Sequence, residues 1–449
     1  MLLLISLAGL AAAEEYSLME PFSMTVYIGN EAAGVRAYDA NYRNNIYLSL
    51  HDLSYALSGT EKQFSFEYGK TAQDGEYHAI TTGQPFKAEN NGITQDPLEA
   101  REDVWLAFKR NRIFLNGADR KYYTYREGGF DLYISLTDLQ LMLDLNLQLL
   151  SHDSLRIDTT ASFTPDYSFL QEEGFFDAVN SFVLGDADTN TVLWALDPNE
   201  PVSIASISKL MTYLLVCEAH ERGELSFEEP VLISEHASEV SQSSDGIISM
   251  EPGQSTTVTE LLNAMLVASS NESAVALAER VAGTEEQFVA RMNERASQLG
   301  LTTAKFYSPN GLPVYTLSAQ PVKLQNQMSA YELFQFSSYV LKKYPEITEI
   351  TSQAYASMPS LEYITANSNP LVFNLPGVNG LKTGSTNRAG YCLSASMPVT
   401  VNGETHDIIL VLLGSENGAD RGQQTELLLR CAENFYRENG FVTGVQRGR

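Results

Sequence analysis

The first third of the chain alternates apolar and polar residues over short stretches, the period expected of strands with one buried face. Residues 16–160 are also rich in tyrosine, and one pattern occurs in them twice. The segment 46–53 (IYLSLHDL) is repeated as 132–139 (LYISLTDL), and 26–30 (VYIGN) and 113–117 (IFLNG) precede the two copies. In each copy a short strand leads through a serine into a helix with leucines on one face, so the sequence predicts a β-rich duplicated module.

The second half changes to apolar residues that recur every three or four positions, as on helices with one buried face. Predicted helices run from Ser206 to Gly223 and over 258–265, 273–281, 286–299, 330–342 and 424–436. Predicted strands are a hairpin of 182–184 and 192–196 and, much later, an antiparallel meander of 380–384, 390–395 and 407–413. Helices between sequence-distant strands indicate an α+β domain, in which one sheet carries a helical block on its face.

Two segments flank the duplicated module. Residues 1–13 are apolar and end in three alanines, as the core and cleavage end of a secretory signal do, although no Lys or Arg precedes Arg36. This signal-like segment is too short to span a bilayer, and no later apolar run is long enough, so no transmembrane span is expected. Small and polar residues within 161–172 indicate a linker, which leaves 173–449 as a second domain.

Composition argues against binding to nucleic acid, a disulfide framework and a metal site. The 449 residues include 29 basic and 56 acidic ones, and this net charge of −27 disfavours binding to nucleic acid or an anionic membrane through a basic face. Cys217, Cys392 and Cys431 are too scattered for a disulfide framework and are expected as small buried side chains. The six histidines lack metal-ligand spacing, so we expect no metal and no cofactor.

Three short motifs carry the candidate chemistry: Ser206-Ile207-Ser208-Lys209, Ser269-Ser270-Asn271 and Lys382-Thr383-Gly384. Each alone is typical of an ordinary helix start, helix cap or strand end. Their order and spacing are informative, because a helical subdomain can fold between the first two and a strand can return with the third. A serine hydroxyl is a poor nucleophile until a base takes its proton, and Lys209 lies one helical turn from Ser206.

The remaining motif residues complete a serine acyl-transfer site. Lys209 can act as the base only if burial or a second cation, for which Lys382 is the candidate, lowers its pKa by about 3 units. Ser269 can relay a proton to a leaving amine, and Asn271 can fix Lys209 and a substrate amide. The candidate substrate-binding residues are Lys382, Thr383, Gly384 and Ser385. Lys382 and Thr383 can bind a substrate carboxylate, and Gly384 lets a peptide approach the strand closely. The backbone N–H of Ser385 can form an oxyanion hole together with that of Ser206.

From about residue 178 onward the chain resembles the low-molecular-weight penicillin-binding proteins, the serine-type D-alanyl-D-alanine carboxypeptidases, which carry these three motifs. The resemblance extends to 186–189 (DADT), 205–212 (ASISKLMT), 251–253 (EPG), 306–312 (FYSPNGL) and 377–384 (GVNGLKTG). It implies a penicillin-binding/β-lactamase-like transpeptidase fold and removal of the terminal D-Ala from peptidoglycan stem peptides through a Ser206 acyl-enzyme. It also implies inhibition by β-lactams and an extracytoplasmic or cell-wall location in a bacterium.

The same residues leave several functions open. The chain has no evident C-terminal amphipathic anchor, and Arg421 and Arg388 are both candidates for an arginine that the family often carries after its last core strand. A class A β-lactamase would need an added carboxylate motif that is not found between Asn271 and Lys382. A D,D-endopeptidase on cross-linked peptidoglycan and an inactive wall-binding protein of the same fold also fit the motifs. The duplicated module is weakly similar to copper amine oxidase N-terminal-like modules, without evident copper ligands, and its ligand is unknown.

Overall fold

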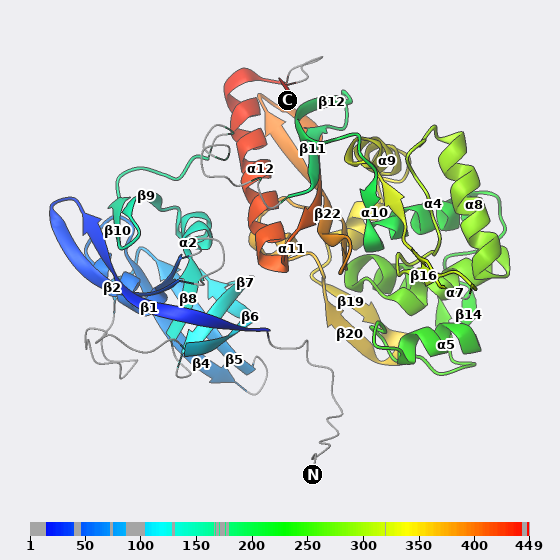
Figure 1. Ribbon diagram of the computed structural model, residues 1–449, viewed down its shortest axis with the longest axis horizontal. Coiled ribbons are helices and arrows are strands. Elements are labelled where there is room, and N and C mark those ends of the chain that lie inside the picture. Colours follow the sequence, from blue (N-terminus) through cyan, green and yellow to red (C-terminus); the bar gives the residue numbers. More distant parts are fainter. Residues whose placement is uncertain are drawn as a thin grey trace, which may run out of the picture. The chain divides into compact units, whose positions relative to one another are not determined.

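The computed structural model describes residues 15–39, 46–71, 75–86, 104–127, 131–165, 167, 170, 176, 179–318, 320–441 and 447–448 (Figure 1). They belong to two compact units, Met1–Thr164 and Pro165–Arg449. The signal-like segment 1–13 lies outside the described residues, as do residues 166, 168, 169, 171 and 172 of the predicted linker 161–172.

The first unit runs twice through the same order of elements. The first copy comprises β1 (Glu15–Ile28), β2 (Glu31–Asp39), β3 (Ile46–Ser49), α1 (Leu50–Ala56), β4 (Phe64–Thr71) and β5 (Gly75–Thr82). The second comprises β6 (Val104–Leu115), β7 (Ala118–Glu127), β8 (Asp131–Ser135), α2 (Leu136–Leu143), β9 (Asn146–Ser151) and β10 (Ser154–Asp158). Ser49 and Ser135 cap the two helices by accepting from the backbone N–H of Asp52 and Asp138.

The strands of this unit form one sheet in the order β4-β5-β6-β7-β8-β3-β2-β1-β10-β9. Matching each strand with its counterpart in the other copy makes this order palindromic. At its centre the counterparts β3 and β8 pair antiparallel with Leu48 opposite Ile134, the same position of the repeat. The last hairpin of each copy is exchanged, because β5 pairs with β6 and β10 pairs with β1. Each copy therefore completes the sheet of the other about a pseudo-twofold axis.

A second pairing, between β1 and β6, closes the six central strands into a ring. The ring has a small buried cluster of equivalent pairs, Met19/Leu106, Tyr38/Tyr125 and Tyr47/Tyr133. The rings of Tyr38 and Tyr133 meet edge to face at 4.6 Å, and those of Tyr47 and Tyr125 repeat this contact at 4.7 Å. The aromatic contacts thus follow the same pseudo-symmetry as the backbone.

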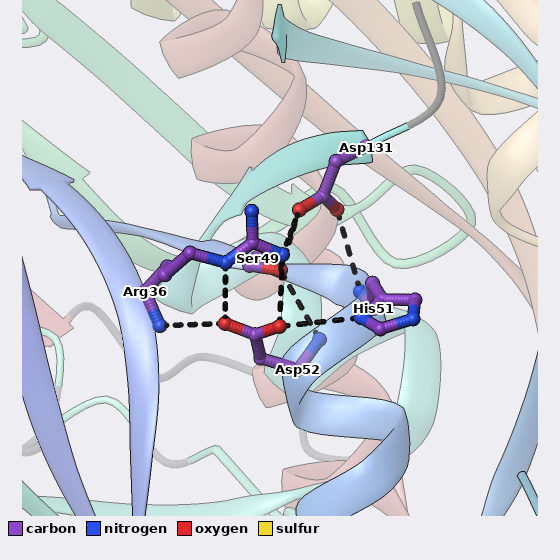
Figure 2. A network of polar contacts seen from close by, with 5 residues as sticks. All are labelled: Arg36, Ser49, His51, Asp52 and Asp131. Atoms are coloured by element: carbon purple, nitrogen blue, oxygen red, sulfur yellow. Dashed lines mark hydrogen bonds and ion pairs between the residues drawn. The ribbon is translucent and has the colours of Figure 1, made fainter. Parts of the chain in front are cut away.

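A charged network joins the two copies near the axis (Figure 2). Arg36 on β2 donates to both carboxylate oxygens of Asp52 at 2.8 Å and to Asp131 on β8 at 2.7 Å. Ser49 donates to the same oxygen of Asp131 at 2.8 Å. Complete burial raises the pKa of Asp131 to about 6, although the charge of Arg36 opposes this. Asp131 therefore depends on Arg36 to remain ionised inside the unit.

The second unit contains a six-stranded sheet in the order β21-β22-β23-β11-β12-β24. Its strands are β11 (Ser181–Asp186), β12 (Thr191–Leu196), β21 (Gly380–Thr386), β22 (Gly390–Val401), β23 (Glu404–Ser415) and β24 (Arg447–Gly448). Its larger helices are α4 (Lys209–Glu221), α5 (Glu235–Gln242), α7 (Asn271–Ala282), α8 (Glu285–Gln298), α9 (Ala330–Lys343) and α12 (Gly418–Asn439). Shorter elements are η2 (Ala205–Ser208), α6 (Val258–Asn263), η3 (Ala264–Ala268), α10 (Ile347–Thr351), η4 (Pro359–Leu361), α11 (Leu371–Asn374), and the strand pairs β13 (Val202–Ser203) with β18 (Gln327–Met328), β14 (Pro230–Leu232) with β15 (Ser255–Thr257), β16 (Val314–Tyr315) with β17 (Lys323–Leu324), and β19 (Tyr355–Met358) with β20 (Tyr363–Ala366).

The sheet of the second unit lies between α12 on one side and the helical block on the other (Figure 1). Alternate residues of β23, Ile409, Val411 and Leu413, belong to the core shared with the helices. Inside the block, residues 209–219 of α4 are all buried. Because α4 is buried on every side, Lys209 at its first position lies in the protein interior.

The predicted α+β fold and the meander β21-β22-β23 are confirmed. Two helix starts differ from the sequence-based expectation. Ser206 lies in the 3₁₀ turn η2, and the α-helix begins only at Lys209. The last helix begins at Gly418 because the Asn417 side chain accepts from two backbone N–H groups there. All three cysteines are buried, as predicted. Among the described residues, no helix has the length and apolarity to cross a membrane.

Candidate active site

Ser206 and Lys209 contact each other at the junction of η2 and α4. The Nζ atom of Lys209 lies 2.8 Å from the Oγ atom of Ser206. Lys209 Nζ also lies 2.7 Å from Asn271 Oδ1 and 2.6 Å from the carbonyl oxygen of Asn310. An amide oxygen and a carbonyl can only accept, whereas a hydroxyl can donate or accept. The amine donates to all three oxygens, as an ammonium can, and Ser206 donates to the Asn310 carbonyl. A neutral amine would donate to the two acceptors and keep its lone pair for the Ser206 proton once the hydroxyl turns toward it.

Burial makes that neutral form accessible. The side chain of Lys209 has no solvent exposure, and burial lowers its pKa to about 7, while the charge of Glu272 raises it. The cation expected to assist, Lys382, is itself completely buried, and burial followed by repulsion from Lys209 and Arg421 holds its pKa well below the usual value. Burial is thus the main cause of the low pKa of Lys209.

Asn271 and Ser269 differ in how they meet the pair. The amide of Asn271 is oriented because its Nδ2 donates to the carbonyl of Asp245 at 2.7 Å, which leaves Oδ1 facing Lys209. Ser269 connects η3, a π-helical turn, to α7 in a left-handed conformation with φ +66°. Ser269 is half-buried. The hydrogen bonds found for Lys209 Nζ go to Ser206, Asn271 and Asn310 rather than to Ser269. The relay assigned to Ser269 therefore stays a prediction.

The third motif lies on β21, the strand at one end of the sheet and in contact with η2. Lys382 Nζ donates to the carbonyl of Thr383 at 3.0 Å, and no carboxylate partner is found for it among the described residues. Thr383 Oγ1 lies 2.7 Å from Ser368 Oγ, and Ser385 is exposed. Gly384 packs so closely that an added Cβ would lie 2.8 Å from the carbonyl oxygen of Ile204. A larger residue would push this strand away from the backbone that precedes Ser206.

Of the two candidate arginines, Arg421 is the one whose charge acts on the site. Arg421 lies on α12, is buried, and contributes to the low pKa of Lys382. Arg388 is exposed in the turn between β21 and β22. A buried edge strand with two cations nearby is suited to an anionic chain end.

The sequence patterns did not reveal two groups that contact the pair or its neighbours. The carbonyl of Asn310 accepts from both Lys209 and Ser206, the latter at 3.2 Å. A backbone acceptor has no side-chain signature, although the segment 306–312 was itself a recognisable feature. Glu272 directly follows Asn271 and is fully buried. An acidic residue in the first turn of a helix resembles an ordinary dipole partner, so its burial could not be anticipated.

One group among the described residues has the side chains for a metal ion: Asp186, Asp188 and His406. His406 already lies 2.6 Å from Asp186 and 3.0 Å from Glu404, and these carboxylates raise its pKa although burial lowers it. Such an arrangement favours a protonated histidine that pairs with these carboxylates. The absence of a metal in this protein stays a prediction.

Comparisons with known proteins concern this second unit. A family model described as D-alanyl-D-alanine carboxypeptidase matches residues 175–417. The D-alanyl-D-alanine carboxypeptidase DacF of Bacillus subtilis is 35% identical over 259 residues, which cover 57% of this chain and 62% of that protein. A D-alanyl-D-alanine endopeptidase of Escherichia coli is 30% identical over 224 residues, 48% of this chain and 66% of that protein. The chain thus spans less than two thirds of the length of these curated relatives.

Solved structures show the same similarity. A peptidoglycan synthesis regulatory factor of Streptococcus pneumoniae superposes with a TM-score of 0.52 at 30% identity, over 57% of this chain and 71% of that one. Penicillin-binding protein 6B of Escherichia coli gives a TM-score of 0.50 at 28% identity, over 57% of this chain and 77% of that one. The penicillin-binding-protein fold predicted for the second domain is confirmed. These matches leave the weak resemblance of the first module untested.

Proposed function

Because the chain belongs to the D-alanyl-D-alanine carboxypeptidase family, we propose that it removes the terminal D-alanine from peptidoglycan stem peptides through an acyl-enzyme on Ser206. One observation carries the proposal: the buried amine of Lys209, with a pKa near 7, lies 2.8 Å from the Ser206 hydroxyl. A lysine that is half neutral at pH 7 can accept the hydroxyl proton.

In the first step Ser206 Oγ attacks the carbonyl carbon of the penultimate D-alanine, and its proton passes to Lys209. The oxyanion would be held by the backbone N–H groups of Ser206 and Ser385. The C–N bond then breaks, and the amine of the terminal D-alanine takes a proton from Lys209 through Ser269. Water hydrolyses the ester and restores the Ser206 hydroxyl. These steps transfer only protons and an acyl group, so they require no cofactor.

The free carboxylate of the peptide would meet Lys382 and Thr383, with the charge of Arg421 nearby. Support comes from Lys382, whose buried amine has carbonyl and hydroxyl oxygens of Thr383 as its hydrogen-bond partners. A charged amine without a counter-ion is costly at this buried position, and an incoming carboxylate would supply the counter-charge that favours the ammonium form. An extended peptide can also add to the free edge of β21 past Gly384.

The test combines a mass spectrum of the intact protein after benzylpenicillin with an assay of D-alanine release from a stem pentapeptide. β-Lactams mimic the D-Ala-D-Ala end, so we expect one penicilloyl adduct, located on Ser206, and free D-alanine from the peptide. A protein that forms no adduct and releases no D-alanine would instead be a wall-binding protein of the same fold.

A second candidate activity is D,D-endopeptidase cleavage of cross-linked peptidoglycan. It is favoured by the 30% identity to an endopeptidase of Escherichia coli, close to the 35% identity to a carboxypeptidase. Product analysis separates the two activities, since cleavage of cross-linked dimers without release of D-alanine from pentapeptides would favour the endopeptidase. Either substrate would place the protein outside the cytoplasm, in the wall of a bacterium, with no nucleic acid partner.

A further inference from the structure

Glu272 is a buried carboxylate that the proposed reaction does not use. It has no solvent exposure and follows Asn271 in the first turn of α7. Its oxygens accept from the backbone N–H of Ile248 at 2.6 Å, from the hydroxyl of Ser270 at 2.8 Å and from the N–H of Ile247 at 3.3 Å. These are neutral donors, and no basic side chain pairs with Glu272 among the described residues. A buried charge without a contacting counter-ion is costly, which suggests a functional reason for it.

The hydrogen bonds of Glu272 attach one segment to the site. Asn271 holds the carbonyl of Asp245, and Glu272 holds the N–H groups of Ile247 and Ile248. Gly246 between them has no room for a Cβ against the carbonyl of Ser241. Two consecutive side chains of α7 thus fix the segment 245–248, and the same Asn271 contacts the amine of Lys209. Displacing Glu272 would therefore also release Asn271 from its orientation.

The charges around Lys209 are few. Glu272 on α7 attracts its ammonium, while Lys382 on β21 is repelled by Lys209 and by Arg421 on α12. The groups in direct contact with Lys209 Nζ, from Ser206, Asn271 and Asn310, are neutral. Among the described residues facing Lys209, Glu272 is therefore its counter-charge.

Building on the proposed function, we propose that Glu272 is a positioning residue that acts through Lys209. Its negative charge favours the protonated amine of Lys209, and its hydrogen bonds hold the segment 245–248 that orients Asn271.

The experiment measures the acylation rate with fluorescent penicillin from pH 5 to 9 for the wild type, Glu272→Gln and Glu272→Asp. Loss of the charge in Glu272→Gln favours neutral Lys209, so the acid limb of the profile should move down by about one pH unit. Glu272→Asp keeps the charge, so its limb should stay at the wild-type pH even if the rate falls. The matched control is Glu332→Gln, because Glu332 also accepts from two backbone N–H groups, those of Thr302 and Thr303, away from the site.

An unshifted limb in Glu272→Gln, or an equal shift in Glu272→Asp or Glu332→Gln, would overturn the proposal. If Glu272→Gln does not fold, Glu272→Asp remains a test. This variant keeps the negative charge, so a shift of its acid limb would contradict the role of the charge. If the wild type itself is not acylated, the proposed function fails instead. Glu272 is then tested by an NMR titration that follows the ¹³Cε resonance of Lys209 against pH. The midpoint of this titration should lie at a lower pH in Glu272→Gln than in the wild type, and an unchanged midpoint would refute the inference.

Discussion

Gly311 packs directly on the backbone of Ala205, so that a Cβ at position 311 would clash with the Ala205 carbonyl. Gly311 also has φ +89°, in the region that favours glycine. Because Gly311 has no side chain, the segment that carries the Asn310 carbonyl can pack closely against the turn that carries Ser206.

The first prediction follows from this contact. Gly311→Ala should destabilise the protein by about 2–4 kcal/mol, from backbone strain and displacement of Ala205, and slow acylation of Ser206 by penicillin. Thermal unfolding and the labelling rate measure the two effects. Gly300→Ala is the control, because Gly300 has φ +74° but open space around it, and it should lose about 1 kcal/mol with normal labelling. Normal labelling of Gly311→Ala would contradict the prediction.

Replacement of the nucleophile should separate chemistry from stability. Ser206→Ala removes a half-buried hydroxyl that donates to the Asn310 carbonyl at 3.2 Å, so the free energy of unfolding should change by about 1 kcal/mol or less. Covalent labelling by fluorescent penicillin should be abolished. Ser338→Ala, which removes a buried hydroxyl donating to Phe334 within α9, should keep full labelling. Undiminished labelling of Ser206→Ala would assign the nucleophile elsewhere.

The pH dependence of acylation should follow Lys209. Burial lowers its pKa to about 7, so below that pH the amine is protonated and lacks the lone pair that accepts the Ser206 proton. The acylation rate should therefore rise with pH, about tenfold per unit, up to a midpoint near pH 7 and then level off. Stopped-flow measurements with a penicillin reporter test this, and a rate that is constant between pH 5 and 8 would exclude Lys209 as the base.

Lys382 should act on the substrate carboxylate rather than on the acylation chemistry. Lys382→Gln should lower kcat/KM for an acyl-D-Ala-D-Ala peptide by about 10- to 100-fold, the value of a hydrogen bond to a charged group. A peptide ending in an amide lacks that charge and should be processed by the variant and the wild type at similar rates. Equal losses for both peptides would mean that Lys382 does not recognise the carboxylate.

The charged network of the first unit predicts a stability effect that is independent of the active site (Figure 2). Arg36→Met leaves the buried Asp131 and the half-buried Asp52 without their cation, which should destabilise this unit by about 3–5 kcal/mol while penicillin labelling persists. Lys62→Met removes a more exposed ion pair to Asp144 in the same unit and should cost about 1 kcal/mol or less. Comparable unfolding curves for the two variants would contradict the role of burial.

Sequence patterns grouped three side chains that the structure brings into contact, but they did not reveal the groups around them. Ser206, Lys209 and Asn271 could be grouped because motif order and side-chain chemistry are local properties. The Asn310 carbonyl could not be found, since every residue offers the same backbone acceptor. Burial of Glu272 was equally invisible, because it arises from the segment 245–248 folding over α7. In the first unit the repeat indicated two copies, but the exchange of β5 and β10 depends on which sheet edge each hairpin reaches, and sequence patterns do not encode that choice.

The exchanged hairpins also determine when the first unit can fold during synthesis. Of the strands that the structure describes in this unit, β1 is made first and its partner β10 last. Contacts so distant in sequence slow folding and leave early strand edges unpaired. The nascent first copy has no complete sheet of its own, so translation must proceed past Asp158 before this unit can become a cooperative structure.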